Sequence, residues 1–155
     1  MSAVLGLSRK TMLALEAVLD VAYNARPDPV QSKDITRRQG VPQRYLEHVM
    51  QAFVHHGILK GVRGPKGGYI LARERRRITV GEVVRVVERA SAEAGGEAEP
   101  ASQGALGLRL VEPLRAEVHA AMLERLDAIT MEDLCRRAHD LGIAHDAKTP
   151  PDFTI

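Results

Sequence analysis

The chain has 155 residues, enough for one modest hydrophobic core and an appended element. Hydrophobic residues make up 45% of it and aromatic residues only 3%, so the core has to be built mainly from aliphatic side chains. One cysteine excludes an internal disulfide framework and a CxxC zinc module. No apolar run approaches the ~20 residues of a membrane span, and the N-terminus lacks a signal-peptide pattern, so we expect a cytoplasmic protein.

The net charge of +2 conceals an asymmetry along the chain. Residues 1–90 hold 16 Lys and Arg against 8 Asp and Glu, a balance of +8, whereas residues 91–155 hold 6 against 12, a balance of −6. Because Lys and Arg supply much of the affinity for phosphate, the basic part is suited to nucleic acid. A solvated basic surface would have the same composition, so charge alone leaves both interpretations open.

Helical periodicity and end signals predict a helix-turn-helix in the basic part. Ser8 can cap a first helix over residues 8–24. The apolar face expected on this helix comprises Met12, Leu15, Leu19 and Ala22. A short helix over 32–39 and a longer helix over 42–56 are separated by a turn that contains Gly40. A short helix, a glycine-containing turn and a longer helix is helix-turn-helix spacing.

Residues 58–72 predict a β-hairpin with a positively charged tip. The apolar runs at 58–62 and 69–72 suit two short strands. Between them, residues 63–68 are Arg-Gly-Pro-Lys-Gly-Gly, whose glycines allow a tight turn. A helix with a polar outer face followed by a basic β-ribbon is the winged-helix arrangement, which favours a DNA-binding protein.

The acidic part of the chain begins after one more predicted helix. Thr79 and Glu82 form a T-x-x-E capping box, which predicts a helix that closes the domain core. Residues 91–107 are rich in Ala, Gly, Glu and Ser and are expected to form a flexible linker. A long helix and a short terminal helix are expected over residues 108–142, and a loose tail over 143–155.

We expect the long helix to form a homodimer interface. Its apolar residues recur at steps of three or four, and they are Val111, Leu114, Val118, Met122, Leu126 and Ile129. Little chain remains to cover this stripe, although the helix could instead fold back on the N-terminal domain. We favour the dimer because symmetric DNA regulators need a second copy. The predicted fold is mainly α with a small β-hairpin, namely a winged helix-turn-helix domain over 1–90 plus a long dimerisation helix.

Candidate DNA-contacting residues come from three places. They are Ser8, Arg9 and Lys10 in the first helix, Gln43, Arg44, Tyr45, Glu47 and His48 in the third helix, and Arg63, Gly64, Pro65, Lys66 and Gly67 in the wing tip. In the third helix, Arg suits guanine, Gln suits adenine and Glu suits the cytosine amino group. Glu47 favours direct reading of cytosine because phosphate would repel it. Arg63 is suited to a narrow A·T-rich minor groove, while an ordinary polar helix face remains the alternative for the third helix.

Three other residues are candidate metal ligands, but their pattern is weaker evidence for a site. Cys135 and His139 lie four apart on the last predicted helix, a spacing that suits two metal ligands, and Glu112 is a third candidate. A buried structural cysteine beside an exposed histidine explains the same pair, and this is the interpretation we favour. No P-loop, H-E-x-x-H or nucleophile motif occurs, so we expect no enzymatic activity.

Four stretches of the sequence are distinctive when taken together. They are Leu7-Ser8-Arg9-Lys10, Arg44-Tyr45-Leu46-Glu47, Val62-Arg63-Gly64-Pro65-Lys66-Gly67-Gly68-Tyr69 and Ile78-Thr79-Val80-Gly81-Glu82-Val83. These stretches resemble the Rrf2 family of bacterial transcription regulators, whose members control iron–sulfur cluster assembly, the nitric oxide response and cysteine metabolism. The resemblance runs from about Leu7 to Leu141 and implies a homodimer on a pseudo-palindromic operator. It implies that Arg44, Glu47 and His48 meet the major groove and that Arg63 with Gly64 enters the minor groove.

The chain departs from the cluster-binding members of this family. Those members carry three closely spaced cysteines before the long helix, where this chain has none, and Glu112 falls where a histidine ligand is found. At His48 the cluster-assembly regulators have glutamine, which leaves the preferred operator open. The resemblance therefore implies a repressor of iron–sulfur, sulfur or redox-related genes that holds no cofactor. Its DNA binding would be controlled by a small molecule or by a partner protein. The alternative is an iron–sulfur or metal-dependent redox sensor with atypical ligands, for which DNA binding is the readout.

Overall fold

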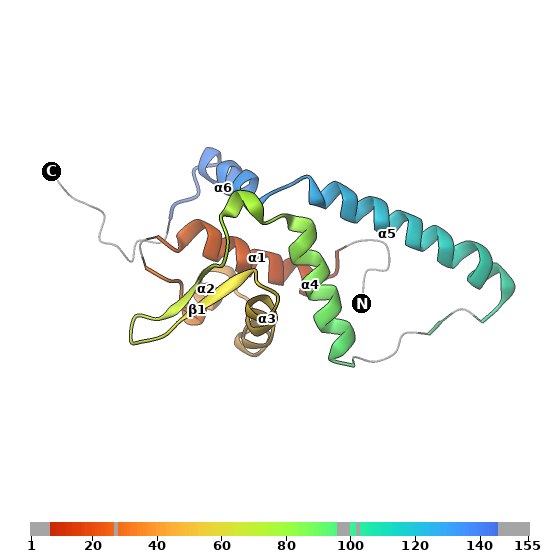
Figure 1. Ribbon diagram of the computed structural model, residues 1–155, viewed down its shortest axis with the longest axis horizontal. Coiled ribbons are helices and arrows are strands. Elements are labelled where there is room, and N and C mark those ends of the chain that lie inside the picture. Colours follow the sequence, from red (N-terminus) through yellow and green to blue (C-terminus); the bar gives the residue numbers. More distant parts are fainter. Residues whose placement is uncertain (1–6, 27, 96–99, 102, 146–155) are drawn as a thin grey trace.

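The computed structural model of the chain describes residues 7–26, 28–95, 100–101 and 103–145 (Figure 1). In chain order the elements are α1 (Arg9–Asn24), α2 (Ser32–Gln39), α3 (Gln43–His55), β1 (Leu59–Val62), β2 (Gly68–Leu71), a 3-10 turn (Arg75–Arg77), α4 (Val80–Glu93), a π-helical turn (Gly107–Val111), α5 (Glu112–Asp127) and α6 (Met131–Asp140). The expected mainly helical fold with one small hairpin is confirmed. Among these residues, no helix is both long and apolar enough to cross a membrane.

The helix ends of the N-terminal domain follow from local side chains. The Ser8 hydroxyl accepts a hydrogen bond from the Thr11 amide (3.1 Å), which caps α1 as expected. Gly40 ends α2 with a φ of 69°, a left-handed conformation that glycine adopts without a Cβ clash. Gln31 is the N-cap of α2, and α3 begins one residue after Pro42.

Small residues form much of the buried face of α1, so the apolar face expected for it is confirmed at Ala22 but wrong at Met12. Ala14, Ala17, Val18 and Val21 are fully buried, whereas Met12 is 50% exposed. Leu15 and Leu19 pack only partly against the core. The largest buried side chains instead come mainly from α2, α3, the start of the wing, the segment before α4 and the start of α6. They are Ile35, Leu46, Met50, Phe53, Ile58, Leu59, Ile78 and Met131. Close approach of α1 to these elements requires small side chains on α1.

A buried ionic contact fixes α2 against α1. Asp20, on α1, is 3% exposed and its carboxylate accepts hydrogen bonds from Arg38 Nε (2.9 Å) and a terminal Arg38 nitrogen (2.6 Å). Gln39 donates a further hydrogen bond to the same carboxylate at 2.8 Å. These bonds compensate the burial of the charge and set the position of α2, on which α3 packs.

The wing is a two-stranded antiparallel hairpin in which Val62 faces Gly68. Tyr69 also exchanges two backbone hydrogen bonds with Val30, at 2.9 and 2.8 Å, which ties the hairpin to the segment before α2. Gly68 permits this approach, because a Cβ there would lie 2.4 Å from the Val30 carbonyl oxygen. The domain therefore holds β2 near its tip end, while residues 63–67 extend beyond the paired strands.

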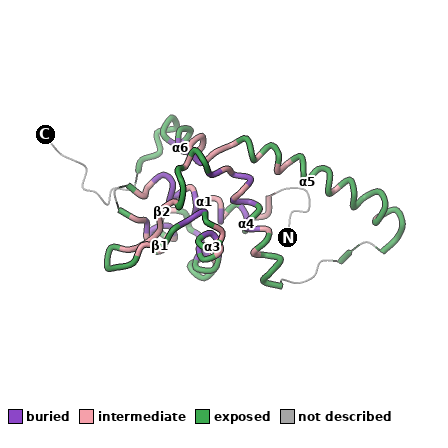
Figure 2. The backbone as a smooth tube through the Cα atoms, in the orientation of Figure 1, coloured by how far each residue is buried: buried purple, intermediate pink, exposed green. Residues whose placement is uncertain are grey.

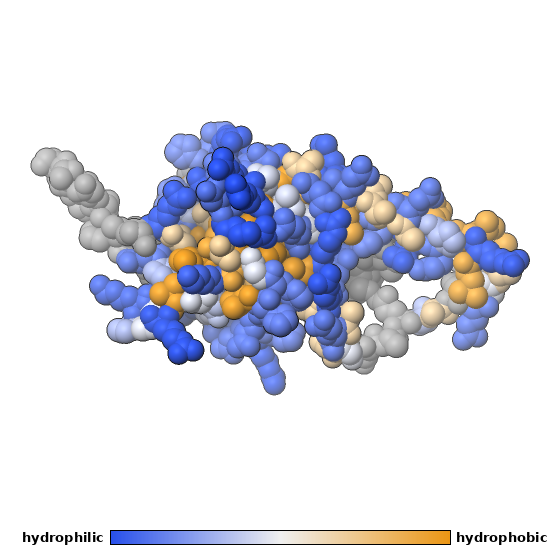
Figure 3. Space-filling view, viewed as in Figure 1, coloured by the Kyte–Doolittle hydropathy of each residue, from blue (hydrophilic) through white to orange (hydrophobic). Residues whose placement is uncertain are grey.

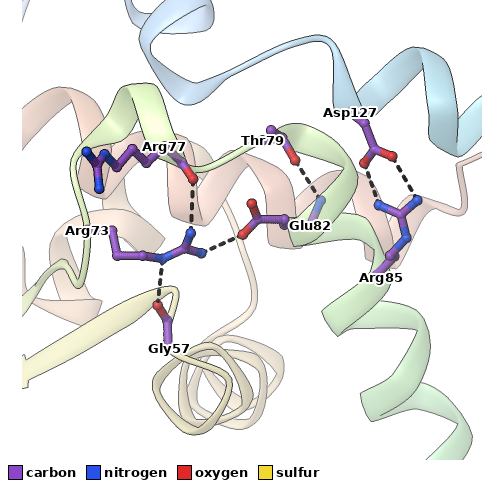
Figure 4. Close-up of polar contacts among 7 residues, drawn as sticks. All are labelled: Gly57, Arg73, Arg77, Thr79, Glu82, Arg85 and Asp127. Atoms are coloured by element: carbon purple, nitrogen blue, oxygen red, sulfur yellow. Dashed lines mark hydrogen bonds and ion pairs between the residues drawn. The ribbon is translucent and has the colours of Figure 1, made fainter.

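Arg73, just after the wing, fastens the wing's exit to α3 and α4 (Figure 4). Its guanidinium donates to the carbonyls of Gly57 (3.4 Å) and Arg77 (3.0 Å) and pairs with Glu82. Thr79 caps α4 by accepting from the Glu82 amide at 3.1 Å. Because the Glu82 carboxylate pairs with Arg73, only the Thr79 half of the expected capping box is formed.

The long helix is continuous from residue 105 to Asp127, and its first half runs away from the domain (Figures 1 and 2). It therefore starts inside the stretch expected to be a linker, and α4 extends into the other end of that stretch, to Glu93. The π-helical turn lies just before Pro113, whose ring would clash with a carbonyl in a regular α-helical turn. The wider turn lets the helix pass the proline without breaking.

The second half of α5 packs on the chain's own core. Leu123, Leu126 and Ile129 lie against buried residues of the domain. Gly81 on α4 permits this approach, since a Cβ there would lie 1.8 Å from the Asp127 carboxylate. The Arg85–Asp127 ion pair also joins α4 to α5, and so does a hydrogen bond between His119 Nε2 and the Glu88 carboxylate at 3.0 Å. The predicted helix thus divides along its length into an exposed first half and a packed second half.

The last described residues return to the end of α1. The Tyr23 hydroxyl donates to the Ile143 carbonyl, and the His145 ring stacks on the Tyr23 ring at 3.9 Å between centroids. His145 Nδ1 also lies 2.8 Å from the Tyr23 carbonyl oxygen. The segment expected to be loose is therefore anchored over residues 143–145, and its remainder lies outside the described residues.

Candidate nucleic-acid interface

One side of α3 is polar and exposed, and the other side is buried. Leu46, Val49, Met50 and Phe53 face the core. The expected base-reading residues, Gln43, Arg44, Glu47 and His48, are all exposed. The 3.6-residue period of the helix brings them onto the outward face of its first turns. The structure therefore brings these four side chains together on one surface.

The wing follows α3 in the chain, and its tip is exposed. Residues 63–66, Arg-Gly-Pro-Lys, are exposed, and β1 packs against α3 (Figure 1). Gly64 has a φ of 113°, a conformation that a side chain would strain. Gly67 is confined too, because a Cβ there would lie 2.2 Å from the Val62 carbonyl oxygen. The two glycines shape the tip that presents Arg63 and Lys66.

Tyr45 links the start of α3 to the first turn of α1. Its hydroxyl donates to the Lys10 carbonyl at 2.7 Å, and burial raises its pKa to about 12. Arg9 and Lys10 are exposed in that turn, while the Ser8 hydroxyl is engaged with Thr11. The Tyr45 hydrogen bond thus joins two exposed cations to the surface that α3 forms.

Gln43 connects α2 to Glu47. The Thr36 hydroxyl donates to the Gln43 side-chain oxygen at 3.0 Å, and the Gln43 amide nitrogen donates to a Glu47 carboxylate oxygen at 3.0 Å. Thr36 was not among the residues that the sequence singled out. Nothing in the sequence pairs it with Gln43, because the contact depends on how α2 and α3 cross.

The residues proposed for dimerisation lie in two environments. Val111 is 58% exposed, Leu114 59% and Val118 40%, whereas Leu126 and Ile129 pack on the chain's own core and Met122 is half-buried. Three further exposed leucines, Leu106, Leu108 and Leu110, extend the apolar surface toward the start of the helix. None of these three leucines was predicted for the dimer surface, and Leu106 lies in the stretch expected to be a linker. Figure 3 shows apolar side chains gathered at this end of the long helix.

The three candidate metal ligands do not form a common site. The Glu112 carboxylate pairs with Arg115 at 2.7 Å, and that hydrogen bond lowers its pKa. Cys135 is 2% exposed, and burial raises the pKa of its thiol. His139, on the same helix, is exposed. Within the described residues, no three His, Cys, Asp or Glu side chains come together as metal ligands would.

A helix-turn-helix whose third helix presents polar side chains, followed by an exposed basic hairpin, defines a winged-helix DNA-binding protein. The model of the family described as "Rrf2: Iron-dependent Transcriptional regulator" matches residues 7–137. The chain belongs to this family and is a DNA-binding transcriptional regulator, not an enzyme.

Its relatives include the HTH-type transcriptional regulator IscR of Xenorhabdus nematophila, 33% identical over 139 residues, which cover 89% of this chain and 84% of the relative. IscR of Escherichia coli is 42% identical over 82 residues, which span about half of each protein, 53% of this chain and 51% of the relative. The solved structure of T. potens IscR has a TM-score of 0.69 at 31% identity and covers 92% of this chain and 94% of that one. CymR of B. subtilis, titled the global cysteine regulator, has a TM-score of 0.61 at 26% identity, with 85% and 97% covered.

The iron in the family description does not fit the donors that this chain offers within its described residues. The single cysteine is buried on α6, and Glu112 is paired with Arg115. An iron–sulfur cluster is ordinarily held by several thiolates, and the sequence holds one cysteine. We therefore derive no role for iron from these residues.

Proposed function

We propose that this chain is a homodimeric repressor that binds a pseudo-palindromic operator, with one α3 helix in each major groove and one wing in each flanking minor groove. The exposed polar face of α3, together with the exposed wing tip at Arg63, carries this proposal. Arg44 would contact guanine and Glu47 would accept from the cytosine amino group. A dimer bound in this way excludes other proteins from the same grooves, which is repression in its simplest form.

The second copy would cover the exposed first half of the long helix. Leu110, Val111, Leu114 and Val118 are between 40% and 64% exposed, an arrangement that costs free energy in water and is typical of an interface. The dimer also doubles the number of DNA contacts, because it places two α3 helices and two wings on one duplex. We place this regulator in the cytoplasm, where its DNA partner would be.

The names of the relatives support a regulon of iron–sulfur, sulfur or redox-related genes, under the control of a small molecule or a partner protein. Chromatin immunoprecipitation with sequencing, combined with transcript profiling of a deletion strain, tests this part. We expect bound sites upstream of such genes, with transcripts that rise when the regulator is deleted. Bound sites whose transcripts fall on deletion, or sites at unrelated genes, would contradict it.

Replacing Arg63 with alanine should weaken binding to A·T-flanked operators by ~1–3 kcal/mol, because a narrow minor groove attracts a guanidinium. Fluorescence anisotropy with two duplexes that differ only in A·T or G·C flanks measures the change. Arg136→Ala is the matched control, since Arg136 is an exposed arginine on α6 with 64% of its side chain accessible. Equal binding by the wild type and the Arg63 variant would remove the wing from the interface.

Replacing Tyr45 with phenylalanine should release the first turn of α1 and lose a phosphate contact from Arg9 or Lys10. Each contact contributes about 0.9 to the slope of log affinity against log salt, so the slope should fall by about one. Titrations at several salt concentrations measure it. Tyr23→Phe is the control, because Tyr23 also donates a hydrogen bond to a backbone carbonyl, that of Ile143. If both variants leave the slope unchanged, the first turn of α1 contributes no phosphate contact through Tyr45.

A further inference from the structure

We propose that Thr36, Gln43 and Glu47 act as one specificity unit, in which Gln43 orients the Glu47 carboxylate and does not itself contact a base. The inference rests on the proposed function, because it assigns roles within the α3 surface that meets the major groove. Gln43 and Thr36 are positioning residues in this scheme, and Glu47 is the residue that touches DNA.

The geometry forms an unbroken chain of hydrogen bonds from α2 to Glu47. The Thr36 hydroxyl donates to Gln43 Oε1, and Gln43 Nε2 donates to Glu47 Oε1, each at 3.0 Å. Thr36 is partly buried, whereas Gln43 and Glu47 are exposed, so the chain runs from the protein to its surface. The four-residue spacing of Gln43 and Glu47 places them one turn apart on the same side of α3.

The direction of each hydrogen bond determines how the Gln43 amide is turned. With its oxygen toward the Thr36 hydroxyl, the amide offers an N–H to the carboxylate. The reversed amide would set its oxygen against a Glu47 oxygen, and two acceptors repel each other. The Glu47 carboxylate, which only accepts, therefore selects this orientation of the amide, and the Thr36 hydroxyl completes it by donating to the amide oxygen.

The same bonds compete with the expected reading of adenine by Gln43. Bidentate recognition of adenine needs both the oxygen and the nitrogen of the amide, one to accept from N6 and one to donate to N7. In this structure the oxygen already accepts from Thr36 and the nitrogen already donates to Glu47. Adenine would therefore have to share each amide atom with a protein partner, through the second lone pair and the second N–H.

The hydrogen bond from Gln43 to Glu47 should change the preference for one base pair and leave the general affinity for DNA unchanged. The hydrogen bond engages one carboxylate oxygen, and the second oxygen stays available to accept from the cytosine amino group. A glutamate that is ordered before binding loses less side-chain freedom when it meets the base, which is worth about a two- to tenfold factor for one immobilised side chain. This gain applies only to the base pair that Glu47 contacts.

Sequencing of duplexes selected from a randomised DNA library by the full-length protein tests the inference. Glu47→Ala first identifies the operator column that Glu47 reads, where we expect the wild type to enrich cytosine. Gln43→Met and Thr36→Val keep side-chain size and remove the hydrogen bonds. Each should reduce the cytosine preference in that column by about two- to tenfold, with the other columns unchanged.

Two control variants separate this effect from a change in folding or helix surface. Thr36→Ser retains the hydroxyl and should retain the preference. Gln51→Met makes the same side-chain change at an exposed position later in α3 and should leave the Glu47 column intact.

The outcomes also distinguish the inference from the function on which it rests. Loss of an adenine preference in another column of the Gln43 variant would show that Gln43 reads a base, and a uniform loss of enrichment would show a structural role. Either result overturns the inference and leaves the proposed function standing. If the wild type enriches no sequence, the proposed function fails and the inference fails with it.

Discussion

Replacing Leu114 and Val118 together with glutamate should convert the protein to a monomer and lower its affinity for a two-site operator by at least about 100-fold, the scale of gain from linking two binding modules. Both residues lie on the exposed first half of the long helix, with Leu114 59% and Val118 40% accessible. Two carboxylates there would be buried without partners in a dimer, which costs several kcal/mol per charge. The monomer keeps its α3 and wing but presents only one of them to DNA.

Sedimentation velocity reports the oligomeric state, and anisotropy on one-site and two-site duplexes reports the binding. Leu141→Glu is the matched control because Leu141 is 78% exposed outside the long helix, just after α6, and should leave both measurements unchanged. Binding to a one-site duplex should survive in the double variant, which distinguishes lost pairing from lost folding. A variant that still sediments as a dimer would show that the first half of the long helix is not the interface.

Replacing Arg38 with alanine should destabilise the domain by ~3–5 kcal/mol, the cost of leaving a buried charge without its main partner. The Asp20 carboxylate, whose side chain is 0% accessible, would keep the hydrogen bond from Gln39 as its remaining side-chain partner among the described residues. A domain of this size has about 5–15 kcal/mol of stability in total, so the loss is a large fraction of it. The loss should also loosen the placement of α2 and α3.

Urea unfolding followed by circular dichroism, at fixed protomer concentration, measures this loss. Arg76→Ala is the control, because Arg76 and its partner Glu74 keep 68% and 62% of their side chains accessible, and we expect a change of at most ~1 kcal/mol there. Replacing Asp20 and Arg38 together with leucine removes the unpaired charge and should recover part of the stability. Equal losses for the Arg76 and Arg38 variants would contradict the assigned role of the buried pair.

The elements of the fold could be predicted because their ends are determined locally. Ser8, Thr79 and Thr130 each accept a backbone N–H in the first turn of the helix that follows. Gly40 takes the left-handed conformation that ends α2. These contacts involve residues that are near one another in sequence, so the sequence alone carries the information.

Packing between distant elements could not be predicted in the same way. The periodicity of α1 indicated a face with large side chains, but the helix is buried through Ala14 and Ala17, because other elements supply the bulk of the core. Glu82 suited a capping box by its spacing, yet Arg73 draws its carboxylate away. In both cases a contact made by tertiary structure outweighed a local preference.

The extent of the exposed apolar surface on the long helix could not be predicted from the sequence either. An apolar repeat from Val111 to Ile129 predicts one continuous stripe, which a single partner would cover. The structure divides it, because Leu126 and Ile129 pack on the chain's own core while Val111 stays exposed. The sequence could not show where along the helix the domain ends and the free surface begins.

Hydroxyl-radical footprinting on a duplex recovered by selection tests the central claim, that a twofold pair of α3 helices and wings binds one operator. We expect protection in two symmetric half-sites whose centres lie about 10 base pairs or a multiple apart, with protected minor grooves on the outer flanks where Arg63 would enter. Protection of a single half-site, or of the α3 contacts without the flanking minor grooves, would contradict the arrangement proposed for this regulator.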